Sequence, residues 1–83
     1  MAVGGDLERE EERQRALGRA QGRVGQAYYR LGRWGEAEAA YEGAVGCYGA
    51  LGEPLERAVR EAMALAQAYL GDTLRRLGRY AEA

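Results

Sequence analysis

The sequence predicts an all-α fold made of antiparallel helix-turn-helix pairs. Apolar residues recur at intervals of three and four along three long segments, which is the period of an amphipathic helix. Each segment closes with Leu-Gly, at 31–32, 51–52 and 77–78, and a glycine just past a helix readily takes the left-handed conformation that satisfies the last carbonyls. A single proline and the lack of alternating apolar and polar residues argue against strands.

The first helix is expected over residues 6–31, after a flexible N-terminus at 1–5. Asp6 is the expected N-cap, because its carboxylate can accept hydrogen bonds from the free amides of the first turn. The second half of this helix carries one apolar stripe, made of Leu17, Ala20, Val24, Ala27, Tyr28 and Leu31. Residues 8–15 are almost entirely charged, which indicates either a solvated extension or an arm that packs on a second copy.

The second helix is expected over 34–51 and the third over 54–77, with Pro54 at its first position, where the missing amide costs nothing. A fourth helix is expected to begin at Tyr80 and is cut short by the end of the sequence. The first two helices then form one hairpin within 6–52, and 54–83 forms an incomplete second repeat. The predicted core positions of the last two full helices are Trp34, Ala37, Tyr41, Ala44, Val45, Tyr48, Leu51, Leu55, Val59, Ala62, Ala66, Tyr69, Leu70, Thr73, Leu74 and Leu77.

Glycines form a strip on each of the first two helices. Each glycine costs up to about 1 kcal/mol relative to alanine in a helix interior. Close approach of the two helix backbones is the compensation we expect. The strips consist of Gly18, Gly22 and Gly25, and of Gly43, Gly46 and Gly49.

The composition argues against an enzyme. Twelve basic residues, all of them arginine, and thirteen acidic residues give a net charge of −1, so there is no bulk electrostatic case for nucleic acid or an anionic membrane. Lysine, histidine and serine are absent, which removes the usual bases and nucleophiles, and we expect neither a cofactor nor a metal. The lone Cys47 fits a small buried side chain and a cytoplasmic setting, and no apolar run is long enough to span a membrane.

A short motif recurs in the chain: residues 31–37 return as residues 77–83, at an offset of 46. Val24-Gly25-x-x-Tyr28, followed by Ala37-x-x-x-Tyr41 and Ala44, resembles the tetratricopeptide repeat, and Leu70-Gly71-x-x-Leu74 with Ala83 resembles the start of a second unit. The long offset is similar to the longer-helix variants of kinesin light chain and of bacterial regulators. The resemblance implies a solenoid of about one and a half to two repeats, in which Tyr28, Trp34 and Tyr41 fill the space between units.

The resemblance also implies a function as a protein–protein interaction module. In the family, the first helix of each unit lines a groove that holds a partner peptide. Because arginine outnumbers acid on that face, an acidic peptide is the expected ligand, and a solvated face without a ligand is the alternative. Carried over to this sequence, the groove-facing positions are Arg19, Gln26, Tyr29, Arg30, Asp72, Arg75 and Arg76.

A second expectation is self-association. The expected third helix lacks a companion that would cover Tyr69, Leu70, Thr73 and Leu74, and exposed apolar stripes mark interfaces. A homo-oligomer joined through these four residues is therefore predicted. Two further interpretations remain open: a structural homodimerisation unit of a larger regulatory protein, and a fragment of a longer repeat array.

Overall fold

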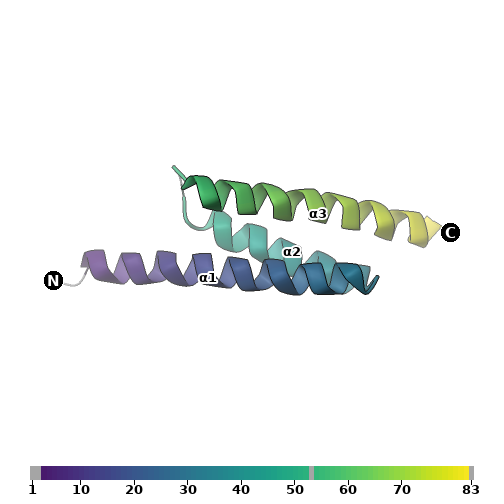
Figure 1. Ribbon diagram of the computed structural model, residues 1–83, viewed down its shortest axis with the longest axis horizontal. Coiled ribbons are helices and arrows are strands. Elements are labelled where there is room, and N and C mark those ends of the chain that lie inside the picture. The colour runs from purple at the N-terminus through teal and green to yellow at the C-terminus, as the bar shows by residue number, and fades with distance from the viewer. Residues whose placement is uncertain (1–2, 53, 83) are drawn as a thin grey trace.

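Three α-helices make up the protein in a computed structural model, which describes the backbone of residues 3–52 and 54–82 and the side chains of residues 5–52 and 54–78. They are α1 (Val3–Arg30), α2 (Trp34–Gly49) and α3 (Arg57–Glu82). Consecutive helices are antiparallel, so α1 and α3 run in the same direction on either side of α2 (Figure 1). The described residues contain no strand, which confirms the all-α prediction.

The first two Leu-Gly stops end helices as predicted. Gly32 and Gly52 have φ angles of +74° and +73°, in the left-handed region that glycine enters without a steric penalty. After α1, the amide of Gly32 donates to the carbonyl of Tyr29 at 3.1 Å and the amide of Arg33 to that of Tyr28 at 2.9 Å. These bonds satisfy the last carbonyls of α1 and turn the chain toward α2.

The prediction that a helix ends at Leu77 and another begins at Tyr80 is wrong, because α3 continues without a break to Glu82. Gly78 is not among the glycines with a positive φ. A glycine permits a turn but does not impose one, and the turn at Gly32 is stabilised by the packing of α2 against α1. Beyond Gly78 the sequence Arg79-Tyr80-Ala81-Glu82 is rich in helix formers, and each residue added to a helix gains a backbone hydrogen bond.

Two predicted helix starts also differ from the structure. Helix α1 begins at Val3, so residues 3–5 are helical and Asp6 lies inside the first turn. There the negative charge of Asp6 interacts favourably with the helix dipole, and its carboxylate forms an ion pair with Arg9 at 3.4 Å. Met1, Ala2 and Ala83 lie outside the described residues. Helix α3 begins at Arg57 rather than Pro54, because the chain stays non-helical while Leu55 packs against the core.

Helices α1 and α2 come into close contact at two glycines of α1. A Cβ atom at Gly25 would lie 2.8 Å from the ring of Tyr41, and one at Gly18 would lie 2.7 Å from the ring of Tyr48. Each tyrosine ring thus occupies the space that a side chain would need, which confirms the expected close approach there. The expected close approach is absent at Gly22, Gly46 and Gly49, where a Cβ atom would have no neighbour within 4 Å.

Packing through this glycine strip turns the predicted apolar stripe of α1 away from the core. Leu17, Val24 and Leu31 remain 44%, 47% and 69% exposed, and the two alanines between them are exposed as well. Only half-buried Tyr28 takes part in the core as predicted. The reason is steric, since the large rings of α2 fit against glycine and would not fit against leucine or valine.

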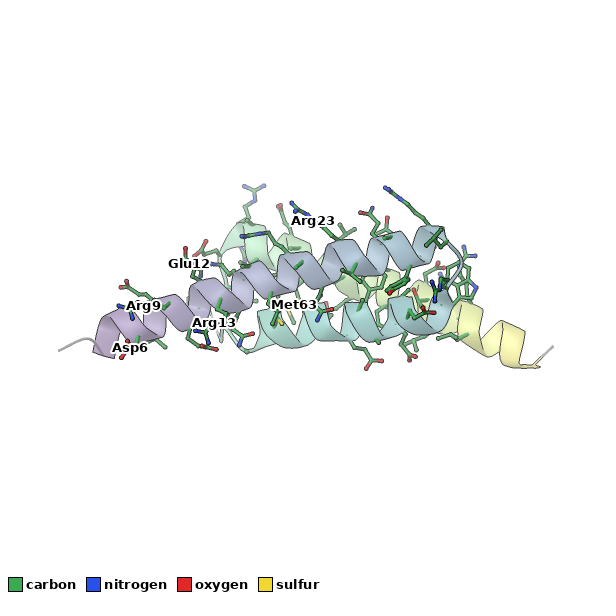
Figure 2. The ribbon with its side chains drawn as sticks, turned by 90° about the horizontal axis from the view of Figure 1, so that it is seen from below. Asp6, Arg9, Glu12, Arg13, Arg23 and Met63 are labelled. Atoms are coloured by element: carbon green, nitrogen blue, oxygen red, sulfur yellow. The ribbon has the colours of Figure 1, made fainter. Side chains whose placement is uncertain are left out.

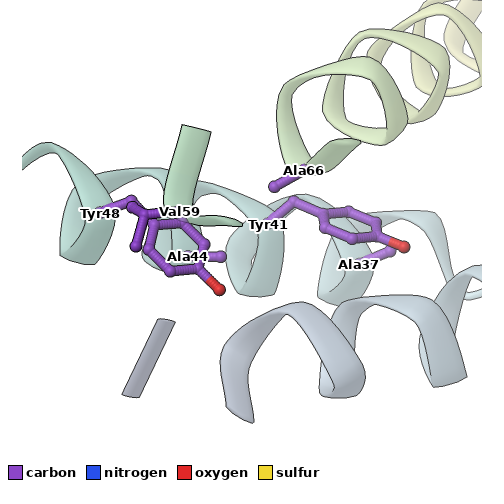
Figure 3. Packing of buried hydrophobic residues seen from close by; sticks show 6 residues of the cluster. All are labelled: Ala37, Tyr41, Ala44, Tyr48, Val59 and Ala66. Atoms are coloured by element: carbon purple, nitrogen blue, oxygen red, sulfur yellow. The ribbon is translucent and has the colours of Figure 1, made fainter. Parts of the chain in front are cut away.

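The core lies where α2 is enclosed by the other two helices (Figure 3). Its buried apolar members are Ala37, Ala40, Tyr41, Ala44, Tyr48, Val59 and Ala66. Thr73 is also buried, and its hydroxyl donates to the carbonyl of Tyr69 at 2.7 Å. The predicted self-association surface is therefore wrong at Thr73, and Tyr69 and Leu70 are half-buried because α2 is their companion. Of the four residues only Leu74, 46% exposed, stays open.

The first three turns of α1 project beyond the other two helices, with Asp6, Arg9, Glu12 and Arg13 along them (Figure 2). Ion pairs within the helix support this projection, such as Arg13 with Glu10 at 3.1 Å. Arg15 instead reaches across to Glu56 at 3.7 Å. Because α3 projects at the other end, the molecule is elongated, with extents of 58 × 19 × 17 Å.

Candidate functional site

A groove runs between α1 and α3, with α2 as its floor. Both outer helices pack on α2 and touch each other far less, so the space between them stays open. The cavity measures about 190 Å³. Its lining residues are Arg19, Gly22, Arg23 and Gln26 from α1, Tyr41 and Tyr48 from α2, and Ala62, Leu65, Ala66 and Tyr69 from α3. We call this cavity the α1–α3 groove.

The groove is wide because its walls carry small side chains. Gly22 on α1 and Ala62 and Ala66 on α3 leave room that larger residues would fill. A second cavity of about 210 Å³ shares Arg19, Tyr48 and Ala62 with the groove and continues it toward the start of α3. The resulting surface is apolar at its floor and polar at its rim, which is typical of a binding cleft.

Arginines form the rim of the groove on the α1 side. Arg19 and Arg23 line the groove itself, and Arg15 lines its continuation. The carboxylate lining these cavities is that of Glu56, which pairs with Arg15. Three guanidinium groups against one carboxylate leave the rim positive, and the guanidinium fork matches the geometry of a carboxylate.

Tyr41 on the floor is unusual because its buried hydroxyl has no hydrogen-bond partner within the described part of the chain. Its ring stacks on that of Tyr69, with centroids 5.5 Å apart and planes within 8° of parallel. Burial raises the pKa of Tyr41 to about 12, since the phenolate would lose its hydration. The floor therefore consists of neutral aromatic surface.

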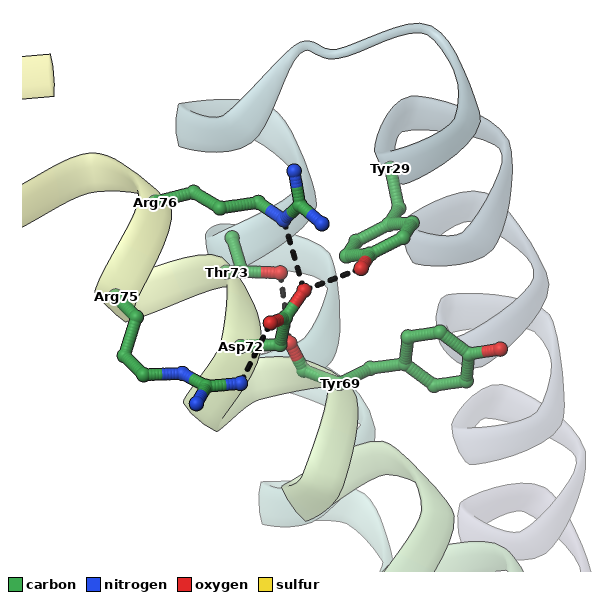
Figure 4. Close-up of polar contacts among 6 residues, drawn as sticks. All are labelled: Tyr29, Tyr69, Asp72, Thr73, Arg75 and Arg76. Carbon is green, nitrogen blue, oxygen red and sulfur yellow. Dashed lines mark hydrogen bonds and ion pairs between the residues drawn. The ribbon is translucent and has the colours of Figure 1, made fainter. Parts of the chain in front are cut away.

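A polar cluster joins α1 to α3 beside the groove (Figure 4). The hydroxyl of Tyr29 donates to a carboxylate oxygen of Asp72, and the same carboxylate accepts bonds from Arg76 at 2.8 Å and from Arg75 at 2.7 Å. The guanidinium of Arg76 also lies over the ring of Trp34 at 4.8 Å. Cation–π contacts of this kind add to the ion pair and hold the three helices together at one end.

Electrostatics in this cluster stabilise the charged form of Asp72. Hydrogen bonds from Tyr29 and then Arg76 hold the pKa of the Asp72 carboxyl well below its usual range. The same hydrogen bond to Asp72 raises the pKa of Tyr29, because ionising the phenol would place two negative charges side by side. The cluster is thus satisfied internally, and its arginines are already engaged.

The structure divides the predicted groove residues between two places. Arg19 and Gln26 line the α1–α3 groove, as the prediction requires. The other members Tyr29, Asp72, Arg75 and Arg76 meet in the polar cluster, and Arg30 is exposed and lines neither cavity.

Sequence reasoning missed several lining residues that a helical period reveals. Arg23 follows Arg19 by four residues and precedes Gln26 by three, so all three share one face of α1. Leu65 and Tyr69 share a face of α3 in the same way. Tyr41 and Tyr48, which form the floor, were predicted only as core residues, and no signal in the sequence marks them as part of a cleft.

Within the described residues, no group of three or more histidine, cysteine, aspartate or glutamate side chains is placed to hold a metal ion. Among the described helices, none combines the length and the apolar character that crossing a membrane requires. Comparison of the chain with protein-family models, with curated proteins and with solved structures finds no match.

Proposed function

We propose that this chain is a protein–protein interaction module of the tetratricopeptide type, spanning about one and a half repeats, and that the α1–α3 groove holds a partner peptide. One observation carries the proposal: two parallel helices flank an open cleft with an aromatic floor and an arginine rim. An apolar floor supplies affinity and a few polar groups fix orientation, which is how small binding clefts work.

The chemistry of the groove favours a peptide with an apolar residue next to carboxylates. Tyr48, Leu65 and Tyr69 offer an apolar surface to one inserted side chain. Arg19 and Arg23 stand on the rim above it and would pair with acidic neighbours of that side chain. The arginines of the polar cluster are occupied by Asp72 and contribute less.

Binding of a fluorescein-labelled peptide with a central leucine flanked by aspartate and glutamate tests this proposal. Charge reversal at both rim positions, Arg19→Glu with Arg23→Glu, should weaken binding roughly a hundredfold, because two charge-assisted contacts become repulsive. The matched control, Arg57→Glu with Arg60→Glu, changes the net charge equally on exposed residues that line neither cavity. An equal loss in both variants would show non-specific charge attraction and refute the groove.

A further inference from the structure

The first turns of α1 form an acidic segment that extends past the other two helices (Figure 2). Residues 6–12 carry five carboxylates and one arginine. Leu7 within this segment is 62% exposed. Asp6-Leu7-Glu8 is therefore an apolar residue between two carboxylates, which is the ligand chemistry that the α1–α3 groove favours. We call residues 6–12 the acidic projection.

The acidic projection and the groove wall lie on one face of α1. Figure 2 shows Glu12 and Arg23 on the same side of the helix. Intervals of three and four residues place six charged residues along this face, in the order Glu8, Glu11, Glu12, Arg15, Arg19 and Arg23. We call these six residues the charged face. It is acidic over its first half and basic over its second half.

Most charges of this face have no ion-pair partner within their own chain. The other two carboxylates of the acidic projection, Asp6 and Glu10, form ion pairs inside α1. In the described part of the chain, the three glutamates of the charged face form no ion pair, and neither do Arg19 and Arg23. Each half of the charged face thus lacks the opposite charge that the other half carries.

We propose that the acidic projection of a second copy of this chain fills the α1–α3 groove, and that two copies do so reciprocally. The inference rests on the proposed function, because it names an occupant of the same groove. Antiparallel α1 helices aligned about Arg15 place residues 6–12 of each copy beside residues 18–24 of the other. Residues 18–24 contain two arginines and no carboxylate, so both reciprocal contacts join opposite charges.

The dimensions of the chain fit this alignment. The lining residues of α1 run from Arg15 to Gln26, a length of about 17 Å, and residues 3–14 before them span the same length. The ion pair between Arg15 and Glu56 marks the end of the three-helix part, just before α3 begins. The three-helix parts of the two copies therefore extend in opposite directions from Arg15, each beside the acidic projection of the other.

Sedimentation equilibrium at low salt tests the pairing. The unchanged chain should form dimers that weaken as salt is added, because salt screens the facing charges. Glu8→Arg with Glu12→Arg, or Arg19→Glu with Arg23→Glu, should weaken self-association about a hundredfold or more, since both reciprocal contacts become repulsive. All four positions are exposed, so the far-ultraviolet circular dichroism spectrum should not change. A monomer at the highest concentration, or a dimer that survives either reversal, would overturn the proposal.

Mixing the two reversed chains is the sharper experiment, because each carries the charges that the other has lost. Together they should form a heterodimer, although neither associates with itself. In the matched control, the chain with reversed glutamates is mixed with Arg57→Glu, Arg60→Glu, which has the net charge of the groove variant but keeps the arginines of the groove. No heterodimer should form there. Equal heterodimer in both mixtures would show non-specific attraction and overturn the proposal.

Crosslinking tests the alignment. In a chain with Cys47→Ala, Arg15→Cys lies at the centre of the pairing, so a short bismaleimide should join two copies. Arg23→Cys should not crosslink, because the two positions 23 lie about 24 Å apart along the helices. Equal crosslinking at both positions would show parallel pairing, and none at position 15 would refute the alignment.

These results separate the dimer from the proposed function. A monomeric chain that still binds the acidic leucine peptide would overturn the dimer alone. A dimer that meets the tests above in a chain that binds no added peptide would instead overturn the function as a receptor for a partner peptide.

Discussion

Replacement of Gly25 by alanine tests whether tyrosine rings in fact fill the space beside the glycines of α1. The new Cβ would lie 2.8 Å from Cε1 of Tyr41 and 2.9 Å from its Cδ1. This ring is only 2% exposed and stacks on Tyr69, so moving it aside would disturb that packing. Alanine gains about 1 kcal/mol of helix propensity over glycine. Overpacking a core costs about 1–3 kcal/mol, so the net change is a loss of up to about 2 kcal/mol.

Gly22→Ala is the matched control. Gly22 lies on the same helix as Gly25, and a Cβ atom at Gly22 would have no neighbour within 4 Å. It should stabilise the protein by about 1 kcal/mol through helix propensity alone. Urea denaturation followed by circular dichroism measures both free energies of unfolding, and their difference cancels the propensity term. If Gly25→Ala is as stable as Gly22→Ala, the close approach of α1 to Tyr41 does not exist.

Four further substitutions test three separate features. Tyr41→Phe removes a buried hydroxyl without a partner in the described structure, so unfolding in urea should show a stability unchanged or raised by about 1 kcal/mol; a clear loss would reveal a hydrogen bond. Asp72 has a lowered pKa, so its contribution to stability is present above about pH 4 and is lost as the pH falls further. The melting temperature of Asp72→Asn should be lower at neutral pH and fall less on acidification; parallel pH profiles would contradict this. Gly78→Ala inside α3 should raise the free energy of unfolding by about 1 kcal/mol, because alanine favours a helix more than glycine does. Gly32→Ala should lower it by about 1–2 kcal/mol, because Gly32 has a φ of +74°. Equal effects of the two variants in urea denaturation would refute the continuation of α3 through Gly78.

The helices and the first two turns could be predicted from the sequence because they depend on local chemistry. Apolar residues at helical spacing located α2 and its buried face, including Ala37, Tyr41, Ala44 and Tyr48. Glycine after leucine located the turns at Gly32 and Gly52. The continuation of α3 past Gly78 was missed because a turn also depends on what the following residues pack against.

The orientation of α1 could not be predicted from hydrophobicity. The period of three and four selects Leu17 and Val24 as the buried face, yet Gly18 and Gly25 face α2 instead. Shape decides here, since the tyrosine rings need a surface without side chains, and periodicity does not measure shape. Spacing along a helix predicts which residues share a face, and Arg19 and Gln26 do line the same cavity. The floor of that cavity was missed because a cleft depends on how the helices pack, which spacing does not reveal.

Mapping of peptide binding by amide chemical shifts tests the proposed groove most directly. On addition of the acidic leucine peptide, the amides of Gly22, Gln26 and Leu65 should shift, because these residues line the groove. Those of Gly46 and Gly49 on the exposed face of α2 should not shift. Shifts confined to the exposed Leu17, Val24 and Leu31 of α1, or no saturable shifts at all, would contradict the assignment of the α1–α3 groove as the binding site.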